Sequence, residues 1–505
     1  METRPAGRPA WALAGLLAGI GGLATSYLTA ALLGLRGNPV TDIGQLVIRL
    51  TPGAVAEDAI SAVKHKDKPL LVLGVLVVSL LLFAGCGLLA RRSPGAGVGG
   101  FVAIGVVGLV ANQSQYAAPA TGILPVVVGV LTWLGCLSVL TSPLRLQPFR
   151  ETDRRRRFLL TASGIGIGSL VVGGLGRRAG GHRRAVDSAR SSLRLTGVTS
   201  PKPPAGVEVG VDGVTAWQTP SSRFYRIDTA LVPPAISPTD WSVRIHGMVD
   251  REVTLSYDDL LKRQRHELWL TLNCVSNPVG GDLISNAWWS GVLLKDLLAE
   301  AGVRSGADAV KQTSDDGWTC GTPLSALTDG RGAMLAVAMN GEPLPIEHGF
   351  PVRTVVPGLY GYVSACKWVR DLEVTTFDSF TAYWTDRGWS AQGPVKLASR
   401  IDVPHDGAHV NAGQVRVGGL AWQQHTGIRG VQVQLDGGGW QDATLSRKTL
   451  ADTWVQWAAS LDVPAGKHQL RVRAVNEDGQ VQTSVRAAPA PNGSSGWHTI
   501  SFTAG

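Results

Sequence analysis

Residues 271–277 read Thr-Leu-Asn-Cys-Val-Ser-Asn and continue an apolar run at residues 268–272 that is typical of a buried β-strand. No histidine lies near Cys274 and the chain has no Cys-x-x-Cys, so the pattern is not that of a zinc site. A single soft thiolate suits a metal whose other ligands come from a cofactor. Taken alone, however, a buried cysteine is most often a small core residue without chemistry.

The sequence around this stretch predicts a mixed α+β domain over residues 205–392. Apolar residues alternate at 241–246, as in a half-buried strand, and leucines at helical spacing after residue 292 predict a helix that ends at Gly302. From about residue 395 short alternating stretches are separated by turns rich in Gly and Asp. We therefore expect residues 393–505 to form an immunoglobulin-like β-sandwich that could act as a dimerisation domain.

The first 176 residues have the composition of a membrane domain. Residues 9–35, 69–90, 93–144 and 158–176 contain no charged residue, and the third stretch is long enough for two helices. We predict five transmembrane helices, with residues 177–204 as a tether. The flanking arginines lie on one side if the N-terminus is cytoplasmic, which places residues 177–505 on the extracytoplasmic side of the cell membrane.

Residues 154–160 read Arg-Arg-Arg-Arg-Phe-Leu-Leu and resemble a twin-arginine export signal. An ordinary membrane anchor with positive residues inside explains the same arginines. The sequence leaves both readings open.

The composition, charge and histidine content exclude a disordered chain and argue against two kinds of partner, nucleic acid and haem. Apolar residues make up 44% of the 505-residue chain and charged residues 17%, which excludes a disordered protein. The net charge of +9 lies almost entirely in the first 176 residues, so we expect no nucleic-acid partner for the rest. The membrane part contains one histidine, His65, and the chain has no Cys-x-x-Cys-His, so we expect no haem. Electrons would then pass to a separate partner, a cytochrome or a quinone.

Several blocks, in this order along the chain, resemble the sulfite oxidase family of molybdenum enzymes around and beyond its metal-binding cysteine. Besides residues 271–277, the blocks are residues 224–228 (Phe-Tyr-Arg-Ile-Asp), 286–292 (Asn-Ala-Trp-Trp-Ser-Gly-Val), 339–345 (Met-Asn-Gly-Glu-Pro-Leu-Pro), 348–353 (His-Gly-Phe-Pro-Val-Arg), 356–358 (Val-Pro-Gly), 360–361 (Tyr-Gly) and 367–368 (Lys-Trp). The resemblance covers about residues 205–505. It implies a membrane α-helical bundle followed by a sulfite-oxidase-type α+β molybdopterin domain and a β-sandwich.

The resemblance also implies the cofactor and its site. Cys274 would bind molybdenum in a molybdenum–molybdopterin cofactor, and Arg226 and Trp318 would lie at the metal as catalytic residues. Arg226 could hold an anionic substrate. The residues expected to bind the cofactor are Phe224, Tyr225, Arg226, Asp228, Cys274, Ser314, Asp315, His348, Arg353, Ser364 and Lys367.

Two departures concern the substrate. Family members that oxidise sulfite keep a tyrosine where this chain has Trp318, and often an arginine where residues 277–279 read Asn-Pro-Val. The resemblance therefore supports cofactor binding better than it supports sulfite as the substrate. We expect a membrane-anchored oxidoreductase that transfers an oxygen atom to or from a small oxyanion.

Two alternatives stay open. One is a reductase of sulfoxides such as methionine sulfoxide, and the other is a cofactor-less binding or assembly protein. The sequence also leaves open whether the chain forms a homodimer and whether Cys320 and Cys366 form a disulfide.

Overall fold

The computed structural model describes residues 7–52, 55, 67–116, 118–145 and 151–505. His65 and residues 146–150 of the arginine-rich segment lie outside the described residues. The chain divides into two compact units. The first comprises residues 1–189 and 229–235, and the second comprises residues 190–228 and 236–505.

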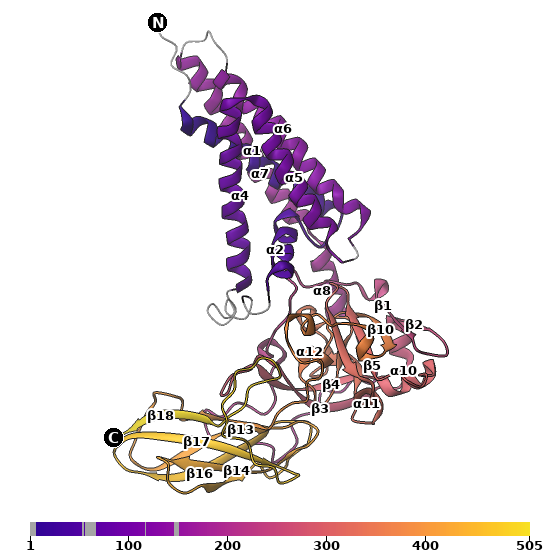
Figure 1. Ribbon diagram of the computed structural model, residues 1–505, viewed down its shortest axis with the longest axis vertical. Helices are drawn as coiled ribbons and strands as arrows, with labels where there is room; N and C mark the ends of the chain where they lie inside the picture. The colour runs from indigo at the N-terminus through magenta and orange to yellow at the C-terminus, as the bar shows by residue number, and fades with distance from the viewer. Residues whose placement is uncertain (1–6, 53–54, 56–66, 117, 146–150) are drawn as a thin grey trace. The chain divides into compact units, whose positions relative to one another are not determined.

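The first unit is a bundle of long helices, drawn in indigo to magenta in Figure 1. Its helices are α1 (Arg8–Leu32), α2 (Pro39–Leu50), α4 (Asp67–Arg92), α5 (Pro94–Gln113), α6 (Ile123–Arg145) and α7 (Glu151–Ala179), with the short helix η2 (Ala120–Gly122) before α6. Among the described residues, five helical stretches (α1, α4, α5, α6 with η2, and Arg155–Ser192, which includes most of α7) are long and apolar enough to cross a membrane. They coincide with the five predicted spans. Helix α8 (His182–Ser192) lies within the residues for which the sequence predicts a tether.

Close contact between helix backbones holds this bundle together. A methyl group at Gly15 of α1 would lie 2.2 Å from the carbonyl oxygen of Phe83 on α4, so the two helices pack closely only because this side chain is absent. The ring of Phe83 in turn packs on Phe101 and Trp133, with centroid distances of 5.7 and 5.3 Å. Residues 229–235 belong to the same unit, where Gln45 of α2 hydrogen-bonds to the backbone at 229 and 231.

Two five-stranded sheets form the core of the α+β part of the second unit. The first has the strand order β2-β1-β10-β5-β6, and the second has the order β3-β4-β7-β8 with β9 paired to β7. The strands are β1 (Ser242–Gly247), β2 (Val253–Ser256), β3 (His266–Asn273), β4 (Ile284–Leu293), β5 (Ala309–Ser314), β6 (Thr319–Pro323), β7 (Met334–Met339), β8 (Glu342–Pro343), β9 (Arg353–Val355) and β10 (Val369–Thr375). The helices are α9 (Tyr257–Lys262), α10 (Leu294–Ala301), α11 (Leu324–Thr328) and α12 (Gly361–Ser364), with short 3-10 turns η3 (Ser221–Arg223), η4 (Pro238–Asp240), η5 (Ile346–His348), η6 (Phe377–Ser379) and η7 (Thr385–Arg387).

Sequence patterns predicted several of these elements. The alternation at 241–246 is β1, and the run at 268–272 lies in β3, whose last five residues are buried. The leucine pattern after residue 292 is α10, which buries its leucines and ends at Gly302 with φ +71°, in the left-handed region. These predictions are confirmed.

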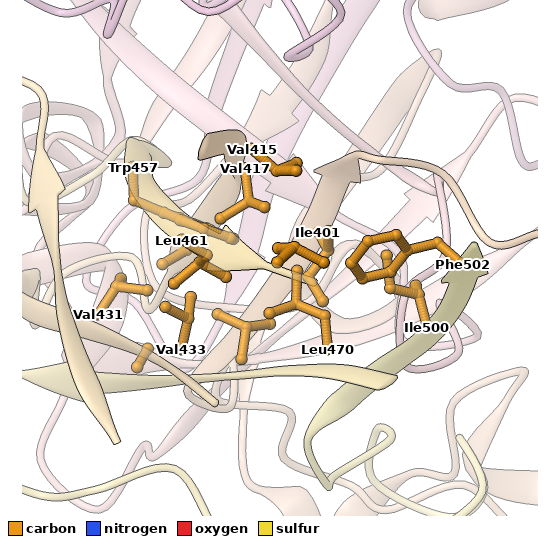
Figure 2. Packing of buried hydrophobic residues seen from close by; sticks show 14 of the residues in the cluster. Ile401, Val415, Val417, Val431, Val433, Trp457, Leu461, Leu470, Ile500 and Phe502 are labelled. Atoms are coloured by element: carbon orange, nitrogen blue, oxygen red, sulfur yellow. The ribbon is translucent and has the colours of Figure 1, made fainter. Parts of the chain in front are cut away.

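The C-terminal part of this unit consists of strands packed in two layers. The strands are β11 (Ala398–Val403), β12 (His409–Val410), β13 (Gly413–Trp422), β14 (Ile428–Leu435), β15 (Gln441–Leu445), β16 (Val455–Val463), β17 (Gly466–Asn476) and β18 (His498–Ala504). They follow the order β11-β13-β16-β15-β14-β17-β18-β12, with β15 joining the two layers. Valines of β13 and β14, Trp457 and Phe502 fill the space between the layers (Figure 2). The predicted sandwich is therefore present, whereas its immunoglobulin-like topology stays a prediction.

Candidate functional site

Cys274 lies directly after β3, at the start of the connection to β4. Its backbone N–H donates to the carbonyl oxygen of Leu283 at 2.9 Å, and the side-chain oxygen of Asn277 accepts from the backbone N–H of Leu283 at 2.9 Å. The side chain is buried, 8% exposed, and burial raises the pKa of the thiol although Ser276 donates hydrogen bonds to the sulfur. Without a metal, Cys274 is therefore a neutral thiol held in a fixed loop.

Cys274 is a single candidate protein ligand for a metal at this site. Among the described residues, no group of three or more His, Cys, Asp and Glu side chains could hold a metal ion. A metal bound at Cys274 would need its remaining ligands from elsewhere, as the sequence predicts.

The cationic side chain of Arg353 lies at the start of β9. Arg353 is 5% exposed, donates to the carbonyl oxygens of His348 at 3.1 Å and of Thr354 at 3.4 Å, and lies over the ring of Trp289 at 5.2 Å. Burial lowers the pKa of Arg353 to about 10. Among the described residues, no carboxylate lies within ion-pair distance of this guanidinium. A buried charge without a counter-ion is costly, so the position favours an anionic ligand.

His348 and Lys367 lie close to this arginine. Burial, together with the nearby charges of Arg353 and Lys367, lowers the pKa of His348 to about 3, so its imidazole is neutral. The ammonium of Lys367 pairs with Asp228 at 2.7 Å and donates to the carbonyl oxygen of Glu347 at 3.1 Å. The charges of Arg353 and Lys367 would stabilise an anion bound here, beside the neutral imidazole of His348.

Phe224 and Tyr225 bring aromatic rings to the same place. The ring of Phe224 lies 5.4 Å from that of Tyr225, and it meets the rings of Trp289 and His348 edge to face, both at 5.6 Å. Burial and the neighbouring Cys274 sulfur raise the pKa of Tyr225, and Arg353 acts in the opposite direction. The phenol of Tyr225 thus lies near both the cysteine and the cationic group.

Two buried polar atoms near these groups have no protein partner. The hydroxyl oxygen of Ser314 and the side-chain oxygen of Asn273 are both buried without a hydrogen bond. Such atoms are rare unless a water or a ligand satisfies them. Together with the buried guanidinium, they indicate that the residues present fit an anionic, hydrogen-bonding cofactor.

Other predicted residues have partners within the protein. Asp315 pairs with Arg370 at 2.8 Å, and Arg226, with a 39% exposed side chain, pairs with Asp228 at 3.0 Å. The hydroxyl of Ser364 donates to the carbonyl oxygen of Tyr360 at 2.9 Å. Trp318 closes the turn between β5 and β6, where its carbonyl oxygen accepts from the N–H of Ser314 at 2.9 Å. Their roles toward a cofactor or substrate stay predictions.

Tyr360, which stands in one of the quoted blocks, lies near Cys274 although the sequence predicted no role for it. Burial and the Cys274 sulfur raise the pKa of its phenol to about 12. Its oxygen accepts from the backbone N–H of Lys396 at 3.3 Å. The position of Tyr360 beside the cysteine depends on the turn that begins α12, which periodicity does not predict.

Cys320 and Cys366 are both free and fully buried. Burial and the adjacent Cys320 thiol raise the pKa of Cys366. The structure therefore brings these two thiols together without a disulfide between them.

Comparisons with known proteins agree with this geometry. The profile of the family described as oxidoreductase molybdopterin binding domain matches residues 230–384. The mitochondrial sulfite oxidase of Mus musculus is 31% identical over 339 residues, which cover 56% of this chain and 61% of that protein. An uncharacterized oxidoreductase of Bacillus subtilis, YuiH, is 34% identical over 176 residues, which cover 35% of this chain and 85% of that protein.

Among solved structures, the sulfane dehydrogenase SoxCD from Paracoccus pantotrophus shares the fold. It has a TM-score of 0.51 and 24% identity, and the match covers 62% of this chain and 88% of that one. The chain spans about three fifths of the length of the sulfite oxidase it matches. The profile, the relatives and the buried cysteine beside a cationic group agree: the chain belongs to the sulfite oxidase family of oxidoreductases, with a molybdenum–molybdopterin cofactor.

Proposed function

We propose that this chain is a membrane-anchored, extracytoplasmic molybdenum enzyme that transfers an oxygen atom to or from a small oxyanion. The observation that carries the proposal is the buried Cys274 thiol together with the buried Arg353, which has no carboxylate partner among the described residues. When bound, the cofactor supplies oxygen-atom transfer coupled to a two-electron change at molybdenum.

In this proposal the protein binds and orients the cofactor and the substrate. Cys274 supplies the thiolate, while His348, Arg353 and Lys367 bind the anionic end of the cofactor and Ser314 hydrogen-bonds to it. Phe224 and Tyr225 would contact the cofactor, and Asp228, Asp315 and Ser364 would support the site through the pairs described above. Arg226, whose side chain is partly exposed, would attract an anionic substrate, with Trp318 near the metal.

The membrane assignment rests on the first unit. Its five apolar helices have the length for spans, and arginines at 91–92 and 154–157 flank them on the side that we assign to the cytoplasm. The second unit would then lie outside, and the segment at 154–160 would direct its export or anchor it. Electrons would pass to a cytochrome or a quinone, and the sandwich would pair two copies as a homodimer.

A second candidate is a sulfoxide reductase on the same scaffold, acting for example on methionine sulfoxide. The observation that favours it is Trp318, which has no phenolic proton where sulfite-oxidising relatives carry a tyrosine. Both candidates use the same cofactor, and they differ in the direction of oxygen transfer.

The test uses the full chain purified in detergent from a host that makes molybdopterin. We expect about one molybdenum per chain, and we expect Cys274→Ser to abolish turnover while Cys136→Ser, a thiol in the first unit, leaves it unchanged. Oxidation of sulfite and reduction of methionine sulfoxide, each measured with an artificial electron carrier, separate the two candidates. A well-folded chain without metal would contradict both and favour the binding or assembly protein.

A further inference from the structure

The loop that follows Cys274 is held by side chains of the C-terminal sandwich. The guanidinium of Arg400, on β11, donates to the carbonyl oxygen of Gly281 at 2.8 Å. The hydroxyl of Ser494, just before β18, donates to the carbonyl oxygen of Asn277 at 2.7 Å. Two residues more than 90 positions apart in the sandwich thus bind successive parts of one short loop.

A third residue, His498, packs against the same loop. A methyl group at Gly280 would lie 2.3 Å from Nε2 of His498, and Gly280 has φ +80°, so only glycine fits under the imidazole. The Nδ1 atom accepts from the backbone N–H of Ile401 at 3.0 Å, which fixes the orientation of the ring. Burial and the nearby Arg400 lower the pKa of His498 to about 4, so the ring is neutral.

The loop transmits these contacts directly to the cysteine. The backbone N–H of Asn277 donates to the carbonyl oxygen of Cys274 at 3.1 Å. The Asn277 side chain accepts from Leu283, whose carbonyl oxygen in turn accepts from the N–H of Cys274. Two hydrogen bonds therefore separate Ser494 of the sandwich from the backbone of Cys274.

The strand on the other side of Cys274 is held by the sandwich as well. Thr271 on β3 donates its N–H to the carbonyl oxygen of Asp452 at 2.9 Å and accepts from the side chain of Gln424 at 2.9 Å. Its hydroxyl oxygen accepts from the N–H of Trp454 at 2.8 Å. Both flanks of the cysteine, three residues before it and three after it, are thus fixed by hydrogen bonds from the sandwich.

We propose that the sandwich sets the position of the Cys274 sulfur toward the metal, with Arg400, Ser494 and His498 as positioning residues. This inference rests on the proposed role of Cys274 as the molybdenum ligand. The sandwich also hydrogen-bonds to residues 209–217, but a sandwich that served only to pair copies of the chain would not need hydrogen bonds on both sides of Cys274.

The choice of variants follows from the burial of each residue. Arg400 pairs with Asp402 at 2.6 Å, with side chains only 9% and 8% exposed, so removing the arginine would leave a buried carboxylate unpaired and endanger folding. Ser494→Ala removes one hydrogen bond. His498→Asn keeps an acceptor for the N–H of Ile401 but removes the ring from Gly280. Ser399→Ala is the matched control, because its hydroxyl donates to Gln482 at 2.6 Å inside the sandwich and does not bind the loop.

Two measurements test the proposal on the full chain in detergent. In the cofactor-free chain, we expect the amides of Cys274 and Leu283 to exchange with deuterium roughly threefold to tenfold faster in Ser494→Ala, and faster still in His498→Asn, than in the unmodified chain. In the loaded chain, we expect both variants to shift the electron paramagnetic resonance signal of the half-reduced metal. Ser399→Ala should change neither property.

The outcomes separate this inference from the proposed function. Unchanged exchange and an unchanged signal in both loop variants would overturn the positioning role while leaving the metal assignment intact. Equal effects in Ser399→Ala would also overturn it, because they would show a general loss of sandwich stability. If the unmodified chain bound no molybdenum, the proposed function would fail, whereas the exchange experiment would still decide whether the sandwich holds the loop.

Discussion

Replacing Arg353 by methionine should separate the stability of the cofactor-free chain from its affinity for the cofactor. The guanidinium is buried, and mainly this burial lowers its pKa from the ordinary value to about 10. At about 1.4 kcal/mol per pKa unit, this corresponds to a cost of about 3 kcal/mol for keeping the charge in the folded chain at neutral pH. Methionine of similar length removes that cost.

The substitution also removes contacts that stabilise the folded chain. It removes the hydrogen bonds to the carbonyl oxygens of His348 and Thr354 and the contact with the ring of Trp289, which together contribute about 3 kcal/mol. We therefore expect Arg353→Met to leave the free energy of unfolding of the cofactor-free chain nearly unchanged, within about 1 kcal/mol. In the loaded chain the same change should release the cofactor.

Thermal unfolding followed by tryptophan fluorescence measures the first effect, with chain produced in a host that lacks molybdopterin. Molybdenum content after dialysis measures the second. Arg370→Met is a suitable comparison, because Arg370 is paired with Asp315 at 2.8 Å. A loss of more than about 2 kcal/mol in the cofactor-free Arg353→Met chain would refute the reasoning, because it would show that the charge is already compensated by the protein.

Three further predictions concern other parts of the chain. The pKa of His348 is about 3 in the folded chain and 6.5 in its ordinary state. As the pH falls, the unfolded chain therefore takes up this proton before the folded chain does. The free energy of unfolding should decrease below pH 6.5, by about 2 kcal/mol at pH 5. His348→Gln should remove this part of the pH dependence of denaturant unfolding in the cofactor-free chain, and an unchanged slope would contradict the assignment. Gly280→Ala should lower the melting temperature and molybdenum content more than Gly388→Ala, which has a similar positive φ of +92° but open space around it. Gly15→Ala should destabilise the helical unit in a detergent melt, whereas Gly74→Ala, which faces no atom within 4 Å, should be neutral, and equal melts would contradict the packing of α1 on α4.

The sequence predicted elements well where one face of the chain is buried. Alternation predicted β1, and leucine spacing predicted α10, because each pattern reflects a single buried face. Helix α8 was not predicted, since most of its residues are polar and it falls where the composition suggested a tether. The five apolar helices were predicted from long stretches without charged residues.

The structure brings several predicted site residues together, but the sequence did not predict how they pair. The family blocks predicted Cys274, His348, Arg353 and Lys367 as site residues, and the last three lie close to one another, while their roles stay predictions. No pattern indicated that Asp228 binds both Arg226 and Lys367, because the partners lie 139 positions apart in the second case. Tyr360 and the contacts from the sandwich depend on tertiary packing in the same way.

The ion pairs of Asp228 bear on how the site would accept its cofactor. Its carboxylate lies within 3.0 Å of the guanidinium of Arg226 and 2.7 Å of the ammonium of Lys367, so without a cofactor it neutralises part of the cationic group. Arg353 has no such neutralising carboxylate among the described residues, and its charge therefore provides the larger gain when an anion binds. The two cations thus differ: Lys367 already pairs with the carboxylate of Asp228, whereas Arg353 would gain a counter-charge from a bound anion.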